Sequence, residues 1–370
     1  NLTRVEGQLR LRFDNTDSIT TLNGLGNVTH LGSLAIQSTT SQLTDISALG
    51  GLTSLGPRNC QPDTGTADDS CLTQIDITSS TIAQLPAWNI AGGTALELLT
   101  LEGLPLADPT QLDDLPVPTK SLRLKGLPLD TDQPGQLAAL VQIASAAQDA
   151  VTLKGMADVK TLPSVPQTAL VELDDLAGID PAALSPIRNI ERITITDGMP
   201  GLAGPNPLSG LTGGTFRTLT LQSLVNVGTL ADLSTVTSLE GLTLNRLAAF
   251  TNLDGLQNLT TLQILRIKDN PKLENLYALR GVTGTLNSVE VVGNSMLTDI
   301  TGLAGITGVS TTLQAYSNAV TECDVLVKSR LTPVPSGFNY YVDPACVYAA
   351  PTLTSSATAL DFGSAPIGST

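Results

Sequence analysis

The stretch LQILRIKDNPKL, residues 262–273, decides the fold of this chain. Within it Leu265 and Ile267 flank the polar residue Arg266, and this period of two is typical of a β-strand that buries one face. A second apolar set follows about ten residues later, and the pair Ala278-Leu279 completes the unit. We therefore predict that each unit contains a strand, a turn, a second short extended segment and a return.

The same apolar–x–apolar pair recurs along most of the chain. From Ile77 onward the separations between successive pairs are 20 to 29 residues, and most are 22 to 24. The pairs are Leu9/Leu11, Leu34/Ile36, Ile75/Ile77, Leu99/Leu101, Leu122/Leu124, Val151/Leu153, Val171/Leu173, Ile193/Ile195, Leu219/Leu221, Leu242/Leu244, Leu265/Ile267, Val289/Val291 and Leu313/Ala315. One unit of this size cannot bury its apolar face alone, so we expect stacked copies that share a parallel sheet and a Leu-filled interior. The predicted fold is a β-rich solenoid, similar to a right-handed parallel β-helix.

Four cysteines form two local pairs at departures from the repeat. The step of 41 residues after Ile36 holds Cys60 and Cys71, which indicates a loop insertion closed by its own disulfide. Cys323 and Cys346 bracket the C-terminal end of the repeats. Neither pair has CxxC spacing, and a chain with one His cannot complete Cys/His zinc sites. We therefore predict two disulfides, no metal site and an oxidising compartment.

Short helical segments are expected where the repeat lengthens or ends. Asp132 and Pro134 are start signals for a helix. Its apolar residues at helical spacing are Leu137, Leu140, Val141 and Ala144. Asp180-Pro181 indicates another short helical start, and residues 321–327 combine an N-cap threonine with acidic residues in a first helical turn. We predict that this last segment belongs to a cap that closes the apolar interior.

Three segments carry a family resemblance: LEGLTLN (239–245), LQILRIKDNPKL (262–273) and LNSVEVVGNSML (286–297). They resemble leucine-rich repeats of the receptor L-domain type, found in insulin-receptor-like ectodomains and in fungal and bacterial surface proteins. Asn270, Asn294 and Asn318 match the family's Asn position, where the resemblance implies that the side chain satisfies backbone groups at the turn after the strand. The equivalent residues of the middle repeats are Leu104, Leu127, Met156, Leu176, Leu224 and Leu247. We expect the turn to differ there.

The C-terminal sequence LDFGSAPIGST, residues 360–370, resembles the opening strand of Ig-like domains of the abnormal-spindle/hydin type. Such domains recur in large bacterial surface and secreted proteins. The resemblances imply two regions: residues 1–348 form a leucine-rich repeat solenoid with a C-terminal cap, and residues 349–370 form a linker and the first strand of an Ig-like domain. We expect the chain to be part of a longer protein. Alternatively, the terminal strand is donated to the sheet edge of a neighbouring molecule.

The charge balance excludes some classes of partner. The chain carries 19 basic and 34 acidic residues, a net charge of −15, and its Lys and Arg are scattered along the sequence. A nucleic-acid partner is not expected, because binding phosphates needs a basic stripe. The sequence contains no run of 18 apolar residues, so no membrane span is expected. The acidity serves solubility, or it reflects a cation-rich habitat or a basic partner.

Catalytic residues are not expected. His30 is the only His, and nothing in the sequence positions an activated Ser beside it. Carboxylate pairs occur at Asp68/Asp69, Asp113/Asp114 and Asp174/Asp175, but a glycosidase needs its two carboxylates across a cleft. Asp63, Asp68 and Asp69 form either a calcium site or a solvated acidic loop, and the solvated loop is favoured because the spacing matches no defined calcium loop. We expect no enzyme activity and no cofactor.

One row of residues is predicted to face solvent along the main sheet, because the residue between the two apolar positions points outward. The row consists of Arg10, Ala35, Asp76, Thr100, Arg123, Thr152, Glu172, Thr194, Thr220, Thr243, Arg266, Glu290 and Gln314. The candidate binding residues are its central members Arg123, Thr152, Glu172, Thr194, Thr220, Thr243 and Arg266. The alternative is that Thr simply suits an exposed strand face, in a ladder held by cross-strand packing and hydrogen bonds.

These observations favour a non-enzymatic recognition or adhesion module of a larger secreted or cell-surface protein. Its ligand would be a protein or glycan surface. The alternative is a structural subunit of an extracellular filament or surface layer, which binds copies of itself through the C-terminal strand.

Overall fold

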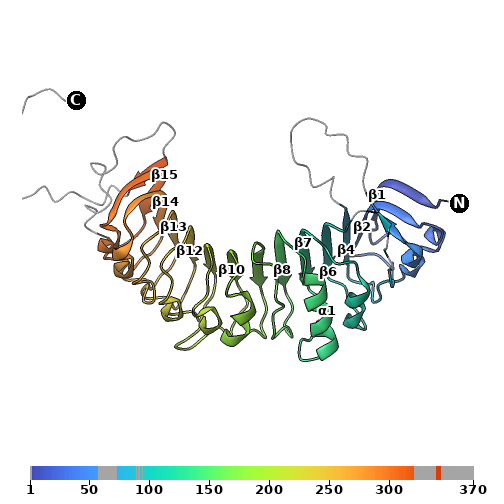
Figure 1. Ribbon diagram of the computed structural model, residues 1–370, viewed down its shortest axis with the longest axis horizontal. Helices are drawn as coiled ribbons and strands as arrows, with labels where there is room; N and C mark the ends of the chain where they lie inside the picture. The colour runs from blue at the N-terminus through green and yellow to red at the C-terminus, as the bar shows by residue number, and fades with distance from the viewer. Residues whose placement is uncertain are drawn as a thin grey trace, which may run out of the picture.

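The structure is a computed structural model that describes residues 2–56, 73–88, 90, 92–93, 95–320 and 339–342, with backbone only at 92–93 and 339–342. The described chain forms an arc, and strands line its concave side (Figure 1). Sixteen strands of the described residues join in one sheet, in which each pairing is parallel. The strands are β1 (Arg4–Arg12), β2 (His30–Ser38), β3 (Ser54–Leu55), β4 (Gln74–Ser79), β5 (Gly92–Gly93), β6 (Leu98–Glu102), β7 (Ser121–Lys125), β8 (Ala150–Lys154), β9 (Leu170–Asp174), β10 (Arg192–Thr196), β11 (Thr218–Gln222), β12 (Gly241–Asn245), β13 (Ile264–Lys268), β14 (Gly284–Val292), β15 (Ile306–Tyr316) and β16 (Asn339–Val342).

The strands follow one another across the sheet in chain order. From β6 to β16 each strand pairs with the next, and β6 continues through β4 and β2 to β1. The first part of β2 also pairs with β3, which in turn pairs with β5. All thirteen predicted apolar–x–apolar pairs lie in strands, so the predicted β-rich fold is confirmed as one parallel sheet with few helices. The sheet extends further than predicted, because β16 adds a parallel strand at residues 339–342.

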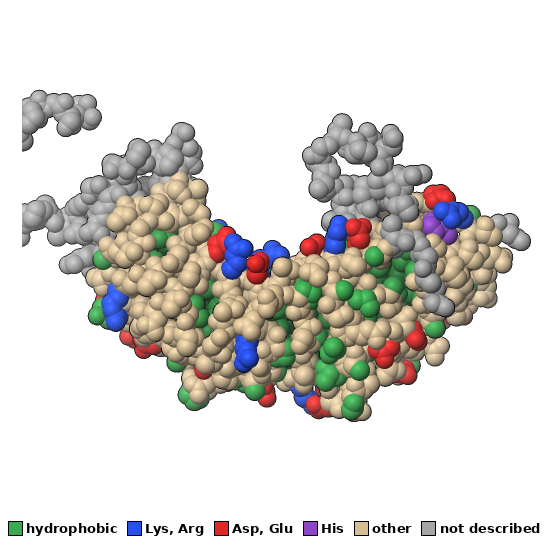
Figure 2. Space-filling view, in the orientation of Figure 1, with side chains coloured by type: hydrophobic (Ala, Val, Ile, Leu, Met, Phe, Trp, Pro, Cys, Tyr) green, Lys and Arg blue, Asp and Glu red, His purple; other side chains and the backbone are tan. Residues whose placement is uncertain are grey.

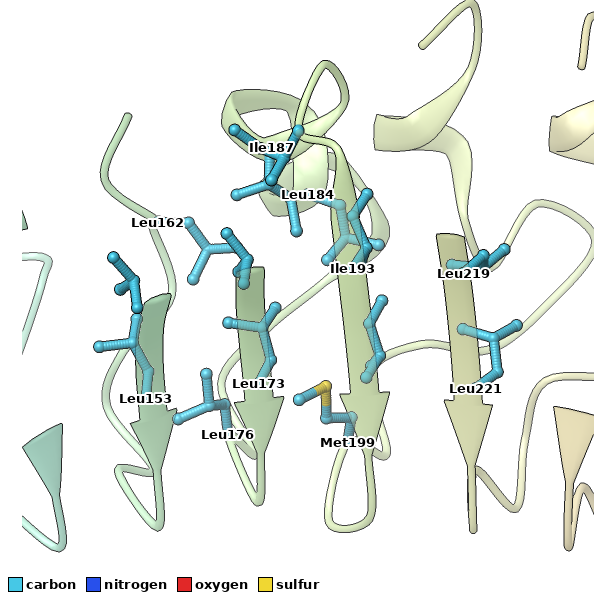
Figure 3. Close-up of a cluster of buried hydrophobic side chains, with 14 of the residues drawn as sticks. Leu153, Leu162, Leu173, Leu176, Leu184, Ile187, Ile193, Met199, Leu219 and Leu221 are labelled. Atoms are coloured by element: carbon cyan, nitrogen blue, oxygen red, sulfur yellow. The ribbon is translucent and has the colours of Figure 1, made fainter. Parts of the chain in front are cut away.

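The interior is filled by aliphatic side chains from the strands and from the returning segments. Leu219 and Leu221 are fully buried, as are Leu173 and Ile195 from the neighbouring strands. Figure 3 shows such side chains on adjacent strands, with Leu184 and Ile187 from the helical turn near Ile193. Each buried Leu or Ile contributes about 1.5–3 kcal/mol relative to an exposed one, so this column stabilises the whole stack.

The convex side carries the helices (Figure 1). They are the α-helix α1 (Pro134–Ala144) and the 3-10 helices η1 (Asn23–Leu25), η2 (Ser47–Gly51), η4 (Pro109–Asp114), η5 (Pro181–Ile187), η6 (Ser209–Leu211), η7 (Ala231–Leu233), η8 (Tyr277–Gly281) and η9 (Thr301–Leu303). The helix predicted after Asp132 is confirmed, but its N-cap is Gln133 and the side chain of Asp132 pairs with Lys160. Val141, predicted on the buried face, is 39% exposed. Asp180 does cap η5, because its carboxylate accepts a hydrogen bond from the Ala183 amide.

The second extended segment is present only as isolated parallel bridges, and the predicted return forms a short helix. At Ala278-Leu279 the chain forms the 3-10 helix η8, and extended pairing in this region is limited to single bridges such as Asn275 with Asp299. The side chain of Asp299 accepts a hydrogen bond from the Thr301 amide at the start of η9. Short polar side chains of this kind compete with strand pairing by turning the backbone locally, which explains why these segments leave the extended conformation.

The turn after the strand was expected to differ between repeats, and this expectation is wrong. One residue with φ between 53° and 73° follows each strand from β6 to β15. These residues are Gly103, Gly126, Gly155, Asp175, Gly198, Ser223, Arg246, Asp269, Gly293 and Ser317. The next residue points into the interior whether it is Leu127, Met156 or Asn270. The backbone turn is therefore shared, and only the buried side chain changes.

The predicted role of the three asparagines is confirmed. The Asn294 side chain accepts a hydrogen bond from the Asn270 amide at 3.0 Å and donates one to the Ile267 carbonyl at 3.0 Å. Asn318 repeats this pattern one turn later, and Asn270 provides the same acceptor for the Leu247 amide. Asn270 and Asn294 are fully buried, so the ladder satisfies backbone groups that water does not reach.

Several predictions lie outside the described residues. They concern the four cysteines Cys60, Cys71, Cys323 and Cys346, the acidic loop with Asp63, the capping segment 321–327, and the C-terminal region 349–370.

Candidate binding surface on the concave face

The predicted outward row lies in unbroken register across the sheet. Arg10 pairs with Ala35, Ala35 with Asp76, and the alignment continues strand by strand to Gln314 on β15. All thirteen members occupy neighbouring positions in successive strands. We call this set the middle row. It runs along the concave side of the arc, where charged side chains lie in the hollow of the molecule (Figure 2).

The candidate residues differ in how much they offer to a ligand. Arg123 is exposed, and Glu172 and Arg266 are partly exposed. Thr152 is only 8% exposed, and its hydroxyl donates a hydrogen bond to Glu172 at 3.2 Å. Thr152 therefore positions the Glu172 carboxylate and presents little surface of its own.

Three threonines occupy the centre of the middle row on β10, β11 and β12. Thr194, Thr220 and Thr243 are register neighbours and are partly exposed. A hydrogen-bonded Thr ladder was expected, but within the described part of the chain their hydroxyls form no hydrogen bond with one another. Their hydroxyl groups are thus available to water or to a ligand.

Two further outward rows flank the middle row, because residues two positions apart on a strand share a face. The upstream row lies two residues before it and the downstream row two residues after it. Across the three rows the charged side chains are eight basic and five acidic. They are Arg10, Arg12, Arg123, Lys125, Lys154, Arg192, Arg266 and Lys268, with Asp76, Glu102, Glu172, Asp174 and Glu290. The basic residues were described from the sequence as scattered, but the fold gathers eight of the 19 on one face.

An ion-pair network holds the C-terminal part of this face. The Glu290 carboxylate accepts a hydrogen bond from Arg266 Nε at 2.7 Å and also pairs with Lys268. Burial by itself raises the pKa of Glu290, but hydrogen bonds from Lys268 and Arg266 outweigh it, so the pKa lies below its usual value. Glu290 therefore stays charged and binds both cations.

A different balance holds near the N-terminal part of the face. Burial, followed by the nearby Glu102 carboxylate, raises the pKa of Asp76. Arg10, Lys125 and Arg123 lower it, and their combined effect is smaller. Asp76 thus lies among three cations whose attraction is weaker than the desolvation penalty of its carboxylate.

A groove of about 590 Å³ lies beside the concave face, at the edge where β9 to β13 begin. Its walls are hydroxyl and amide side chains such as Thr168, Asn189 and Thr237. Arg217 crosses it and pairs with Glu191 at 3.6 Å and with Glu240 at 2.7 Å. One guanidinium therefore holds both carboxylates of the groove.

The remaining candidates offer little chemistry. Contrary to expectation, a Ser does lie beside His30: the His30 Nδ1 and Ser54 Oγ atoms are 2.9 Å apart, and Nε2 lies 3.7 Å from Glu6. The ring is only 4% exposed and links β1, β2 and β3. In the described residues, no group of three or more His, Cys, Asp or Glu side chains is arranged to hold a metal ion. The same part of the chain contains no helix long and apolar enough to cross a membrane.

No protein-family model and no curated protein matches this chain in sequence comparisons.

Proposed function

We propose that this chain is a leucine-rich repeat solenoid of the receptor L-domain-like type that serves as a non-enzymatic recognition or adhesion module of a larger secreted or cell-surface protein. The concave face is its binding surface. One observation carries the proposal: thirteen strands place the middle row in continuous register, and nine of its thirteen residues are at least partly exposed. A surface of this kind repeats in one direction and suits an extended ligand.

The rigidity of the face supports binding. The inward neighbours of Thr220 are Leu219 and Leu221, which are fully buried. Because the backbone under the row is fixed by parallel pairing on both sides, little conformational entropy is lost when a ligand binds.

The non-enzymatic assignment rests on the chemistry of the candidates. The imidazole of His30 is enclosed by the strands, and the carboxylates of the edge groove are held by Arg217. Hydrolysis needs a nucleophile or a proton donor that reaches the substrate, and these groups do not offer one.

Blocking the centre of the face tests the proposal. The full chain would be screened by surface plasmon resonance against cell-surface glycans and proteins, and each ligand found would then be measured with Thr220→Trp. The indole would cover the neighbouring threonines, so binding should fall at least tenfold. Thr212→Trp, after η6 on the outer side, is the matched control and should bind normally. Equal binding by both variants would exclude the concave face.

A second candidate function is a structural subunit of a filament or surface layer. The observation that favours it is β1, which within the described chain pairs only with β2 and so has a free edge of nine residues. A free edge is a template for another strand. Electron microscopy of the purified chain would show ordered filaments that depend on residues 351–370 if this function holds, and dispersed monomers if it does not.

A further inference from the structure

Three strands present a pair of basic side chains on the concave face. The pairs are Arg10 and Arg12 on β1, Arg123 and Lys125 on β7, and Arg266 and Lys268 on β13. In each pair one inward apolar residue separates the two cations, so their Cα atoms are about 6.6–6.8 Å apart. That separation lets both cations of a pair contact one carboxylate or sulfate group, or two neighbouring ones.

The charge of this face opposes the charge of the rest of the chain. The three rows hold eight basic and five acidic residues, which leaves 11 basic and 29 acidic residues elsewhere. The face therefore has a net charge of +3, and the remainder has a net charge of −18. A negatively charged polymer would be repelled by most of the molecule and attracted to one side of it.

Not all of these cations are available to a ligand. Lys125 pairs with Glu102 at 3.5 Å, Lys154 pairs with Asp174, and Arg266 and Lys268 share Glu290. Among the residues that the structure describes, Arg10, Arg12 and Arg123 have no carboxylate partner within 4.0 Å. Arg192 donates only to a backbone carbonyl. The unpaired cations are thus all guanidinium groups, which bind carboxylates and sulfates through two parallel hydrogen bonds.

The spacing of the pairs indicates the size of the ligand. β1 and β7 are four strand steps apart, and β7 and β13 are six steps apart. At about 4.8 Å per step these intervals are roughly 19 and 29 Å along the sheet. A small anion reaches one pair, whereas an extended polymer with repeated negative groups reaches all three.

The surface between the pairs indicates the type of polymer. Thr194, Thr220 and Thr243 offer hydroxyl groups that are not bonded to one another, and these match the hydroxyl groups of sugars. Within the described members of the three rows the one aromatic ring is Tyr316, at the C-terminal end. Protein partners usually use aromatic anchor residues, and the described members of the three rows offer one such ring.

We propose that the concave face binds an acidic polysaccharide, with the unpaired arginines on its carboxylate or sulfate groups and the threonines on its hydroxyls. The proposal rests on the recognition function above and names the chemical class of its ligand. It also explains why an acidic protein keeps basic pairs on one side.

Fluorescence anisotropy with labelled polysaccharides tests this proposal on the full chain. The probes are polygalacturonate as the carboxylated polymer, heparin as the sulfated one, dextran as the neutral one and poly-glutamate as the acidic peptide. We expect at least one of the first two to bind, and dextran and poly-glutamate to bind much more weakly. Binding should weaken steeply between 50 and 200 mM salt, because charge pairs at an exposed face are screened.

The decisive variant removes only unpaired cations, so that no carboxylate loses an ion pair or a hydrogen bond. Arg10→Gln, Arg12→Gln and Arg123→Gln together should raise the Kd by about tenfold, since each exposed charge pair contributes a few-fold. The matched control, Lys272→Gln with Arg188→Gln, removes exposed charges away from the three rows and should change the Kd less than twofold. Thermal unfolding and circular dichroism would verify that the variants fold.

The outcomes separate this inference from the function on which it rests. Preference for poly-glutamate, equal binding of dextran, or an unchanged Kd in the triple variant would overturn the acidic polysaccharide. If Thr220→Trp still abolished binding of some other ligand, the recognition function would stand. If no substitution on the face affected any binding, both would fall. Salt dependence of the unmodified chain gives a readout even if the triple variant does not fold.

Discussion

Asn294→Leu should destabilise the C-terminal repeats although it nearly preserves volume. The Asn294 side chain accepts from the Asn270 amide at 3.0 Å and from the Asn270 Nδ2 at 3.1 Å, and it donates to the Ile267 carbonyl at 3.0 Å. Leucine leaves the Asn270 amide without its acceptor and removes a donor to the Ile267 carbonyl, both in a fully buried region. Each such group costs about 1–3 kcal/mol, and the greater apolar burial of leucine offsets part of this. We expect a net loss of about 2–4 kcal/mol.

Leucine is the informative substitution because the same turn already accepts it elsewhere. Leu127 follows a residue with positive φ, as Asn294 does, and is also buried. Steric conflict with the turn therefore does not explain a loss at position 294. Leu127→Met, which conserves volume and removes no hydrogen bond, is the control and should cost less than about 1.5 kcal/mol.

Urea unfolding combined with amide hydrogen exchange would measure the effect. A stack of repeats can unfold in parts, so exchange at the Asn270 amide reports the local loss that a global midpoint would average. Faster exchange at Asn270 with unchanged exchange near Leu127 is the expected pattern. One hydrogen bond contributes about 1 kcal/mol, so a loss of stability below about 0.5 kcal/mol would be too small for the ladder. Such a small loss, together with normal exchange at the Asn270 amide, would refute the role of the ladder.

Three further outcomes follow from single contacts. Asp76→Asn should raise the free energy of unfolding at pH 7. The folded pKa of Asp76 is raised, so its charge costs stability as pH rises through that pKa. In urea titrations, the stability gained by the substitution should vanish below the unfolded pKa of about 3.9. Glu290→Gln should lower the free energy of unfolding by about 1 kcal/mol at pH 7. The folded pKa of Glu290 is lowered, so its stabilising contribution is present above the unfolded pKa of about 4.3 and is lost as pH falls through the folded pKa. An equal loss at pH 3 would contradict this. Gly302→Ala places a Cβ 1.8 Å from the Leu276 carbonyl oxygen and should lower the thermal midpoint, whereas Gly24→Ala, with nothing within 4 Å, should not.

The strands and their register were predictable because the alternation of apolar and polar residues allows only one register with a buried apolar face. A slip of one residue at Leu219 would expose it together with Leu221 and bury Thr220, so the apolar pair alone fixes which residue faces outward. That is why the register of the middle row was identified correctly from the sequence, although Ala35, Thr100, Thr152 and Glu290 are buried and not exposed as predicted. β16 was missed because its residues 339–342 include no Leu or Ile, and its alignment with β15 depends on backbone pairing.

The turn and the return segments could not be predicted in the same way. Asn270 and Leu127 differ in chemistry, and nothing local to either residue shows that both follow a left-handed residue. The 3-10 helices depend on how a short segment such as η8 meets the next repeat across the interior, which is a tertiary contact. Periodicity detects the apolar residues of these segments but does not distinguish a bridge from a helical turn.

The clustering of cations was missed for a geometric reason. Arg10 and Arg12 are close in the sequence, but Arg123 joins them on the same face only when the strands between them are stacked. The available signal was the repeated pattern of a basic, an apolar and a basic residue at the strand core. Reading the downstream row together with the middle row would have found it.

Asp76 and Glu290 occupy the same row, yet their pKa values shift in opposite directions, and the difference shows where an external anion would be held. Glu290 receives hydrogen bonds from Arg266 and Lys268, so those cations are already used within the protein. Asp76 is influenced by Arg10 and Arg123 only at longer range, and burial outweighs them. The guanidinium groups near Asp76 therefore keep most of their capacity to bind a carboxylate or sulfate, whereas an anion near β13 must compete with Glu290. The N-terminal part of the concave face should provide most of the affinity for an acidic polysaccharide, and the C-terminal part should mainly direct the polymer along the sheet.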